Sequence, residues 1–128
     1  MGSEAVTRNI RVQVETKQDH SRTFPGLGHW FYQYTVTISN EGSETVKLLD
    51  RHWVITDGKG NVEEVRGPGV VGNQPTLEPS QSFQYTSGCP LPTPAGTMRG
   101  SYRLVTRSGE SFDVEIAPFN LTQVELIN

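Results

Sequence analysis

The chain lacks the features of disulfide-rich, membrane-spanning and secreted proteins. Its single cysteine, Cys89, cannot form an intrachain disulfide. No apolar run approaches the roughly 18 residues that a membrane helix requires. Residues 4–15 alternate in polarity, unlike the apolar core of a signal peptide. We therefore expect a cytoplasmic protein that does not insert into a membrane.

A strong excess of charge of either sign is also absent. The 128 residues carry a net charge of −3, and the isoelectric point is about 5.6. This balance gives no general attraction to nucleic acid or to an anionic membrane. We therefore expect no nucleic-acid partner. The length suits a single domain, which we place at residues 4–128 because Met1-Gly2-Ser3 resembles a cloning remnant.

No segment shows the apolar period of a helix. Apolar residues make up 34% of the chain, with 13 glycines and 8 prolines, which is typical of an all-β domain with many turns. Residues 18–28 read as a loop, and Pro90, Pro92 and Pro94 are expected to prevent regular strand pairing. Period-two alternation predicts strands at residues 10–15, 30–38, 46–56, 62–65, 82–86, 98–106 and 111–116.

The register of the final hairpin can be predicted from its side chains. A two-residue turn would set Leu104 opposite Asp113 and direct carboxylates into the core, which is costly. A three-residue turn that ends at Gly109 instead sets Leu104 opposite Phe112. Gly109 readily adopts the left-handed conformation that such a turn requires. We therefore predict the three-residue turn. Phe119 and Leu121 could extend the final strand beyond residue 116.

The most distinctive pattern is Gly67-x-Gly69-x-x-Gly72, which has the spacing of a dinucleotide-binding loop. Such a loop must open a helix, because the helix N-terminus holds the pyrophosphate. Pro75 and Pro79 block a helix here, and the acidic residue expected about 20 positions later is missing. The sequence therefore argues against a Rossmann unit.

Two other uses of this loop stay open. The glycines could simply allow the chain to turn with positive φ. Alternatively, Val70 and Val71 could form an exposed apolar patch at the loop tip, or successive N–H groups could form a nest for an anion. The candidate ligand- or partner-binding residues are Arg51, Trp53, Arg66, Gly67, Pro68, Gly69, Val70, Val71 and Gly72.

Arg51-His52-Trp53 lies in a strand that is predicted to be partly buried. A buried arginine needs a partner, and a buried indole needs an acceptor for its N–H group. The triplet either forms a recognition pair at the surface or anchors the loop that follows, and the sequence leaves both readings open.

Three arginines lie in a stretch that has no Asp or Glu between residues 79 and 109. The predicted hairpin register places Arg99 and Arg103 on the outward face of the sheet, near Arg107. They could form an anion-binding strip. We favour cross-strand pairing instead, of Arg103 with Asp113 and of Arg99 with nearby Glu115.

The sequence offers little for catalysis or metal binding. Cys89 lacks the histidine or helix N-terminus that would activate a thiol. His20, His29 and His52 lie in different elements, and Asp50 is the single further ligand that shares a strand face with His52. We expect no catalytic residues, no metal site and no cofactor.

Motifs along most of the chain fit a single family pattern. They are Arg51-His52-Trp53-Val54-Ile55-Thr56-Asp57-Gly58, residues 62–72, Pro75, Leu77, Tyr85-Thr86-Ser87-Gly88, Gly96-x-Met98-x-Gly100-x-Tyr102, Phe112-Asp113 and Pro118-x-x-Leu121. On these residues, the segment 8–121 resembles the ApaG family, called CorD in some bacteria. Ser80 departs from the pattern, since the family often has glycine there.

The resemblance implies an immunoglobulin/fibronectin type III-like antiparallel β-sandwich of two sheets, with about seven strands. It implies no enzymatic activity and an association with cobalt resistance and magnesium efflux. Similar eukaryotic domains, in F-box proteins and a polymerase delta-interacting protein, look like protein-interaction modules. We therefore predict a non-enzymatic module with a protein partner, monomeric or weakly homodimeric. The alternative is a sensor that binds a phosphorylated nucleotide or a divalent cation at residues 67–72.

Overall fold

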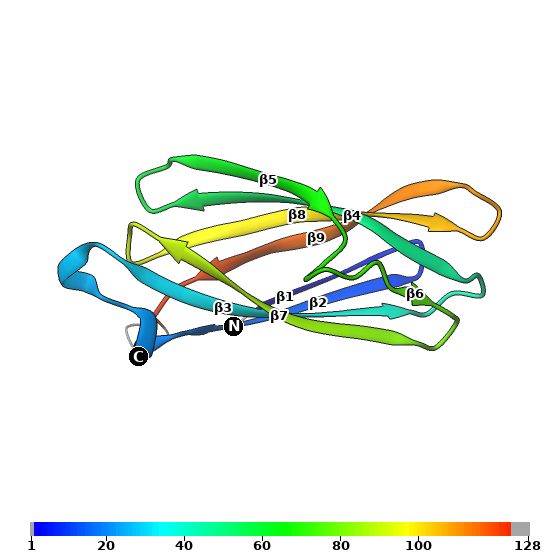
Figure 1. Cartoon of the computed structure of the whole chain (residues 1–128), viewed down its shortest axis with the longest axis horizontal. Helices are drawn as coiled ribbons and strands as arrows, with labels where there is room; N and C mark the ends of the chain where they lie inside the picture. Colours follow the sequence, from blue (N-terminus) through cyan, green and yellow to red (C-terminus); the bar gives the residue numbers. More distant parts are fainter. Residues whose placement is uncertain (1, 124–128) are drawn as a thin grey trace.

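Two antiparallel β-sheets pack face to face, and the core lies between them (Figure 1). The computed structural model describes residues 2–123. One sheet has the strand order β1 (Gly2–Thr7), β2 (Ile10–Gln18), β3 (Trp30–Asn40), β7 (Ser82–Leu91). The other has the order β5 (Val62–Pro68), β4 (Val46–Asp57), β8 (Gly96–Thr106), β9 (Ser111–Leu121), and β6 (Thr76–Leu77) also pairs with β4. The predicted two-sheet sandwich is confirmed.

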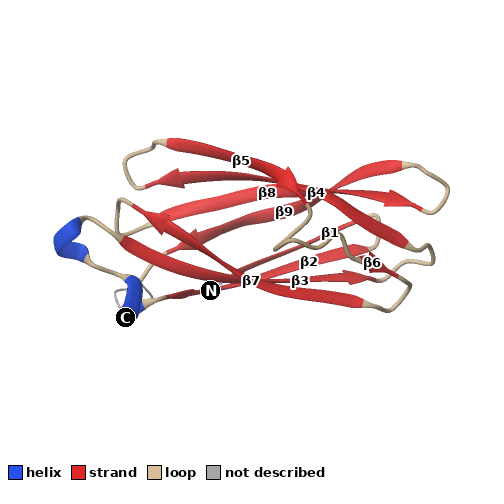
Figure 2. Cartoon of the chain, in the orientation of Figure 1, coloured by secondary structure: helices blue, strands red, loops and turns tan. Residues whose placement is uncertain are grey.

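All seven predicted strands are present, and β1 and β6 are additional. β1 pairs with β2 along its whole length, so the chain already belongs to the sheet from Gly2 onward. The predicted loop before β3 contains two short 3₁₀ turns, η1 (His20–Arg22) and η2 (Pro25–Leu27), drawn in blue in Figure 2. Within residues 2–123, no helix is long and apolar enough to cross a membrane.

Side-chain alternation explains why these segments form strands around one core. In β3, Tyr32, Val36 and Ile38 are buried on one face, while Thr35 and Thr37 on the other face are partly exposed. Burying one face of every strand favours the antiparallel sandwich, since each sheet covers the apolar face of the other.

The final hairpin adopts the predicted register. Leu104 lies opposite Phe112, and the Gly109 N–H donates to the Thr106 carbonyl oxygen at 3.0 Å. Gly109 has a φ of 94°, which glycine adopts without steric cost. The strand also extends as predicted, because β9 continues to Leu121.

The prediction that prolines end strand pairing after residue 86 is wrong for Pro90. β7 continues to Leu91, and Pro90 lies opposite Phe31 of β3. Since β7 is the outer strand of its sheet, a residue without an N–H group is tolerated there. The same holds for Pro68, the last residue of outer strand β5, which is longer than the predicted segment 62–65.

The two open sides of the sandwich are closed differently. On one side β1 approaches β9, where the Ser3 hydroxyl donates to the Ala117 carbonyl oxygen at 2.8 Å. On the other side the chain crosses between the sheets from β5 to β7 (Figure 1), and Val70 in this crossing belongs to the buried core. The crossing segment therefore has a structural role, because it helps to close the core.

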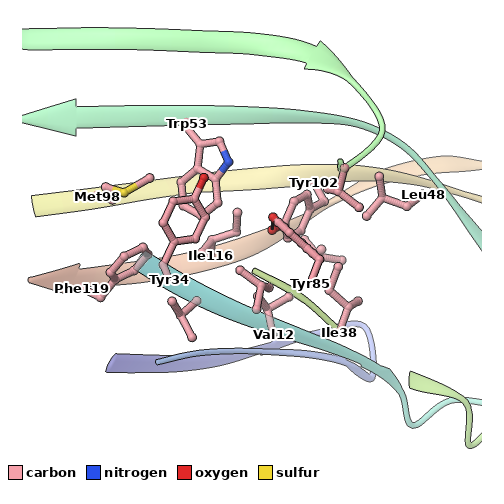
Figure 3. Close-up of a cluster of buried hydrophobic side chains, with 14 of the residues drawn as sticks. Val12, Tyr34, Ile38, Leu48, Trp53, Tyr85, Met98, Tyr102, Ile116 and Phe119 are labelled. Carbon is pink, nitrogen blue, oxygen red and sulfur yellow. Dashed lines mark hydrogen bonds between the residues drawn. The ribbon is translucent and has the colours of Figure 1, made fainter. Parts of the chain in front are cut away.

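Aromatic side chains fill the middle of the core (Figure 3). The ring of Trp53 lies 5.3 Å from that of Tyr34 and 5.9 Å from that of Phe119. The hydroxyl groups of Tyr85 and Tyr102, from opposite sheets, form a buried hydrogen bond. Burial raises the pKa of both phenols, so both stay neutral and can share this bond.

Removing one of these two hydroxyl groups leaves the other without a hydrogen-bond partner in the core. We expect Tyr102→Phe to lower the free energy of unfolding by about 1–2 kcal/mol, because the Tyr85 hydroxyl loses its partner in the core. The double variant Tyr85→Phe/Tyr102→Phe should be no less stable than Tyr102→Phe, since no polar group is left unpaired. Urea unfolding followed by tryptophan fluorescence measures both, and additive losses would contradict this account.

Candidate functional site

A tight turn follows directly after β5. The N–H groups of Val70 and Asn73 each donate to the other's carbonyl oxygen at 2.8 Å. Between them, Val71 and Gly72 have φ values of 42° and 81°, as in a type I′ turn. Gly67 and Pro68, predicted as part of the loop, instead belong to β5.

The side chain of Arg51 fixes the position of this turn by hydrogen bonds. Its Nη1 donates to the carbonyl oxygens of Pro68 and Gly69, both at 2.9 Å. The turn is further fixed at Leu49, whose carbonyl oxygen accepts from the Gly69 N–H at 2.9 Å and from Gln74 Nε2 at 2.8 Å. Of the two readings of Arg51, the structure supports the loop anchor.

The two valines of the turn face opposite environments. Val70 is fully buried, with 0% of its surface exposed, whereas Val71 is 54% exposed. The prediction that both form an exposed patch is therefore wrong for Val70. The reason is the open side of the sandwich, because the crossing from β5 to β7 must supply an apolar side chain there. We define residues 70–73 as the Val71 turn.

The prediction that Trp53 belongs to a binding surface is also wrong. It is 3% exposed and packs within the aromatic core, so it cannot contact a partner at the surface of the folded protein. Its inward position follows from alternation in the part of β4 after the bulge, since its neighbours His52 and Val54 occupy the opposite face of the sheet.

A polar depression of about 790 Å³ adjoins the turn. It contains four of the predicted site residues, Arg51, Arg66, Gly67 and Pro68. We call it the Arg66 depression. Its other lining residues are Leu49, Asp50, His52, Gln74, Ser101, Arg103 and Asp113.

Opposite charges pair within and beside the Arg66 depression. Arg103 Nη2 lies 2.6 Å from Asp50 Oδ2, and this hydrogen bond raises the pKa of the guanidinium. His52 Nε2 lies 2.7 Å from Glu64 Oε1 and lowers the pKa of that carboxyl. Arg66 is the most exposed of these cations, with 72% of its side chain exposed.

The predicted pairing of Arg103 is wrong in its partner. Asp113 lies opposite Arg103 in the strand register, but the ion pair forms with Asp50 on β4. The cause is a bulge between Leu48 and Asp50, which interrupts the pairing of β4 with β8 and re-aims a side chain.

Within residues 69–73, the backbone hydrogen bonds leave Val71 and Gly72 as the two successive N–H groups that could form an anion nest. The N–H groups of Gly69, Val70 and Asn73 already donate to backbone carbonyl oxygens. A nest needs successive N–H groups that point to a common centre. This arrangement favours the reading in which the glycines shape the turn.

Cys89 does not have the environment of a nucleophile. It is buried in β7, and desolvation raises the pKa of the thiol to about 11, which keeps it protonated near neutral pH. Across residues 2–123, no group of three or more His, Cys, Asp and Glu side chains is placed to hold a metal ion.

The fold and this surface define a small antiparallel β-sandwich domain with a glycine-rich turn at the open side. Residues 20–106 match the family model of the ApaG domain. The chain therefore belongs to the ApaG family.

Relatives and solved structures match nearly the whole chain. Protein ApaG of Methylorubrum extorquens (strain PA1) is 54% identical over 123 residues, covering 96% of this chain and 95% of the relative. Protein ApaG of Mesorhizobium japonicum is 54% identical over 117 residues, covering 91% of this chain and 90% of the relative. The crystal structure of an ApaA protein from Bordetella pertussis has a TM-score of 0.89 and 46% identity, and the match covers 94% of this chain and 98% of that chain.

Sequence reasoning missed part of the depression. Gln74 and Ser101 were not candidates, although both line it. Strand alternation correctly predicted that Asp50 and His52 share one face of the strand. No local sequence signal indicated the bulge at Leu49, which brings these residues near Arg103.

Two glycines of the turn allow a matched test of the backbone. A Cβ on Gly69 would lie 2.3 Å from the Asn73 carbonyl oxygen, whereas a Cβ on Gly72 would meet nothing within 4 Å. Both have positive φ. We expect Gly69→Ala to lower the free energy of unfolding by more than about 1 kcal/mol, and by clearly more than Gly72→Ala. Equal losses in urea unfolding would show that the close approach is unimportant.

Proposed function

We propose that the chain is a non-enzymatic cytoplasmic binding module that contacts a protein partner through the Val71 turn and the Arg66 depression. The observation that carries this proposal is the conformation of Val71. A β-branched residue at positive φ is unfavourable, by about 1–3 kcal/mol. Since Val71 is largely exposed, core packing does not offset this cost. Backbone strain of this kind is concentrated at binding sites.

The turn is also rigid, which lowers the entropic cost of binding. The bonds from Arg51, Gln74 and the Gly69 N–H fix its position on β4. A preformed contact loses less freedom when a partner docks. Val71 then supplies an exposed apolar side chain, and Arg66 supplies an exposed cation in the adjoining depression. Apolar anchors and arginine are both common in protein interfaces.

The polar groups support binding more than catalysis. Ser101 lies opposite His52 in the strand register, yet no hydrogen bond joins their side chains within the described residues, and His52 Nε2 contacts Glu64. A serine nucleophile needs a base within hydrogen-bonding distance. The resemblance-based association with cobalt resistance and magnesium efflux then suggests action through a partner.

A second candidate function is binding of a phosphorylated nucleotide or a divalent cation at residues 67–72. The exposed guanidinium of Arg66 favours an anion there. The engaged N–H groups of the turn count against it. This candidate therefore ranks below protein binding.

Val71→Asn separates binding from stability. Asparagine tolerates positive φ better than valine, so the variant should be at least as stable as the wild type. Loss of an apolar anchor should reduce partner capture by about fivefold or more. Immobilised protein exposed to extract of the source cells, with quantitative mass spectrometry of the captured proteins, measures this. Val6→Asn is the matched control, because Val6 is a similarly exposed valine on β1. Equal capture by all three proteins would remove the site assignment.

The ligand candidate has its own measurement. Backbone amide spectra are recorded while Mg²⁺, Co²⁺ or a dinucleoside polyphosphate is added. If protein binding is the function of the turn, we expect no saturable shifts at residues 66–73, because the N–H groups of Gly69, Val70 and Asn73 are engaged in backbone hydrogen bonds. Saturable shifts confined to these residues would instead establish the small-ligand function.

A further inference from the structure

The outer edge of β5 carries a defined set of unpaired backbone groups. At one end of the β4–β5 pair, the Asp57 N–H donates to Asn61; at the other, the Gly69 N–H donates to Leu49. Hydrogen-bonded pairs alternate along an antiparallel ladder, so odd-numbered residues of β5 bond to β4. The even-numbered residues Val62, Glu64, Arg66 and Pro68 therefore direct their backbone groups outward. We call this the β5 edge.

The β5 edge is open to solvent. No other strand within residues 2–123 pairs with it, and β5 is the outermost strand in Figure 1. Val62 is 61% exposed, and the side chains of Glu64 and Arg66 are also largely exposed. An uncovered edge is a template for another strand.

We propose that the β5 edge pairs antiparallel with the β5 edge of a second copy of the chain, about a two-fold axis through Val65. In this register Glu64 of each copy lies opposite Arg66 of the other, and Val62 lies opposite Pro68. The ten strands of the two five-stranded sheets then form one continuous sheet. This inference shares Arg66 with the proposed partner surface, but it does not rest on the proposed function, because Val71 is not part of the β5 edge.

Backbone chemistry fits this register. Val62, Glu64 and Arg66 each offer an outward N–H and an outward carbonyl group. Pro68 has no N–H, and its carbonyl oxygen already accepts from Arg51 Nη1 at 2.9 Å. In the pairing, the N–H groups of Glu64 and Arg66 donate to each other's carbonyl oxygens across the axis. Pro68 lacks an N–H group, so the Val62 carbonyl oxygen of the other copy gains no hydrogen bond there, and the backbone hydrogen bonds of the pairing lie at Glu64 and Arg66.

The pairing of opposite charges favours this register over the registers shifted by two residues. A shift by two residues would set Glu64 opposite Glu64 or Arg66 opposite Arg66, and like charges directly opposite are destabilising. The contacts that Glu64 makes with His52 and Arg66 of its own chain both use Oε1. Oε2 is therefore available to the Arg66 of the second copy.

The interface is small, and the dimer should be weak. Seven residues of edge cannot bury the roughly 1,200–2,000 Å² of a stable protein interface. We therefore expect association in the high micromolar to millimolar range. Sedimentation equilibrium over that range should show the mass rising from the 14.2 kDa of one chain toward twice that value.

A charge exchange tests the register. Glu64→Arg and Arg66→Glu each place like charges opposite one another at two symmetric positions, so each should raise the dissociation constant roughly tenfold. The double variant Glu64→Arg/Arg66→Glu restores opposite charges and should recover the wild-type constant. A wild-type mass that stays at 14.2 kDa at every concentration, or a double variant as weak as the single ones, would overturn the proposal.

A cysteine on the two-fold axis gives a second test that does not depend on affinity. Directly opposite residues that are not hydrogen-bonded have Cα atoms about 4.5 Å apart, which suits a disulfide. Val65→Cys, in a Cys89→Ala background, should form a covalent dimer on mild oxidation. Glu63→Cys is the matched control, since the two copies of that position lie about 13 Å apart in this register. Cross-linking of Glu63→Cys in preference to Val65→Cys would refute the register.

Discussion

The surface of this protein depends on one constraint of its core: the open side of the sandwich between β5 and β7 must be closed. Val70 closes it by burying its side chain there. A chain that brings one residue inward and returns at once needs a tight turn, so Gly69 and Gly72 adopt positive φ and Val71 is left outside. The exposed position of Val71 therefore arises from the requirements of the core.

The parts of this architecture that depend on local chemistry could be predicted from the sequence. Alternation located the seven main strands, and the cost of facing Asp113 into the core fixed the last hairpin. The outcome for Val70 and Val71 could not be predicted, because the two side chains are identical and a distant gap in the core decides which is buried. The partner of Arg103 was missed for a similar reason, since the bulge beside Leu49 arises from pairing between strands far apart in sequence.

The two faces of β4 contribute to different parts of the structure. In β4, Arg51 and Trp53 face the core side, where Trp53 packs among aromatic rings and Arg51 holds the turn. Asp50 and His52 face outward and line the depression. A substitution on either face therefore affects the same surface, directly through the lining or indirectly through the position of the turn.

The prolines on the two outer strands have a consequence for how far assembly can proceed. Pro68 ends β5, and Pro90 lies near the end of β7, the outer strand of the other sheet. A two-fold contact through β5 uses the same strand in both copies and leaves no second copy of that edge to recruit a third chain. Because Pro90 lacks an N–H group, β7 is a poor template for further growth. The arrangement closes on itself and disfavours fibrils.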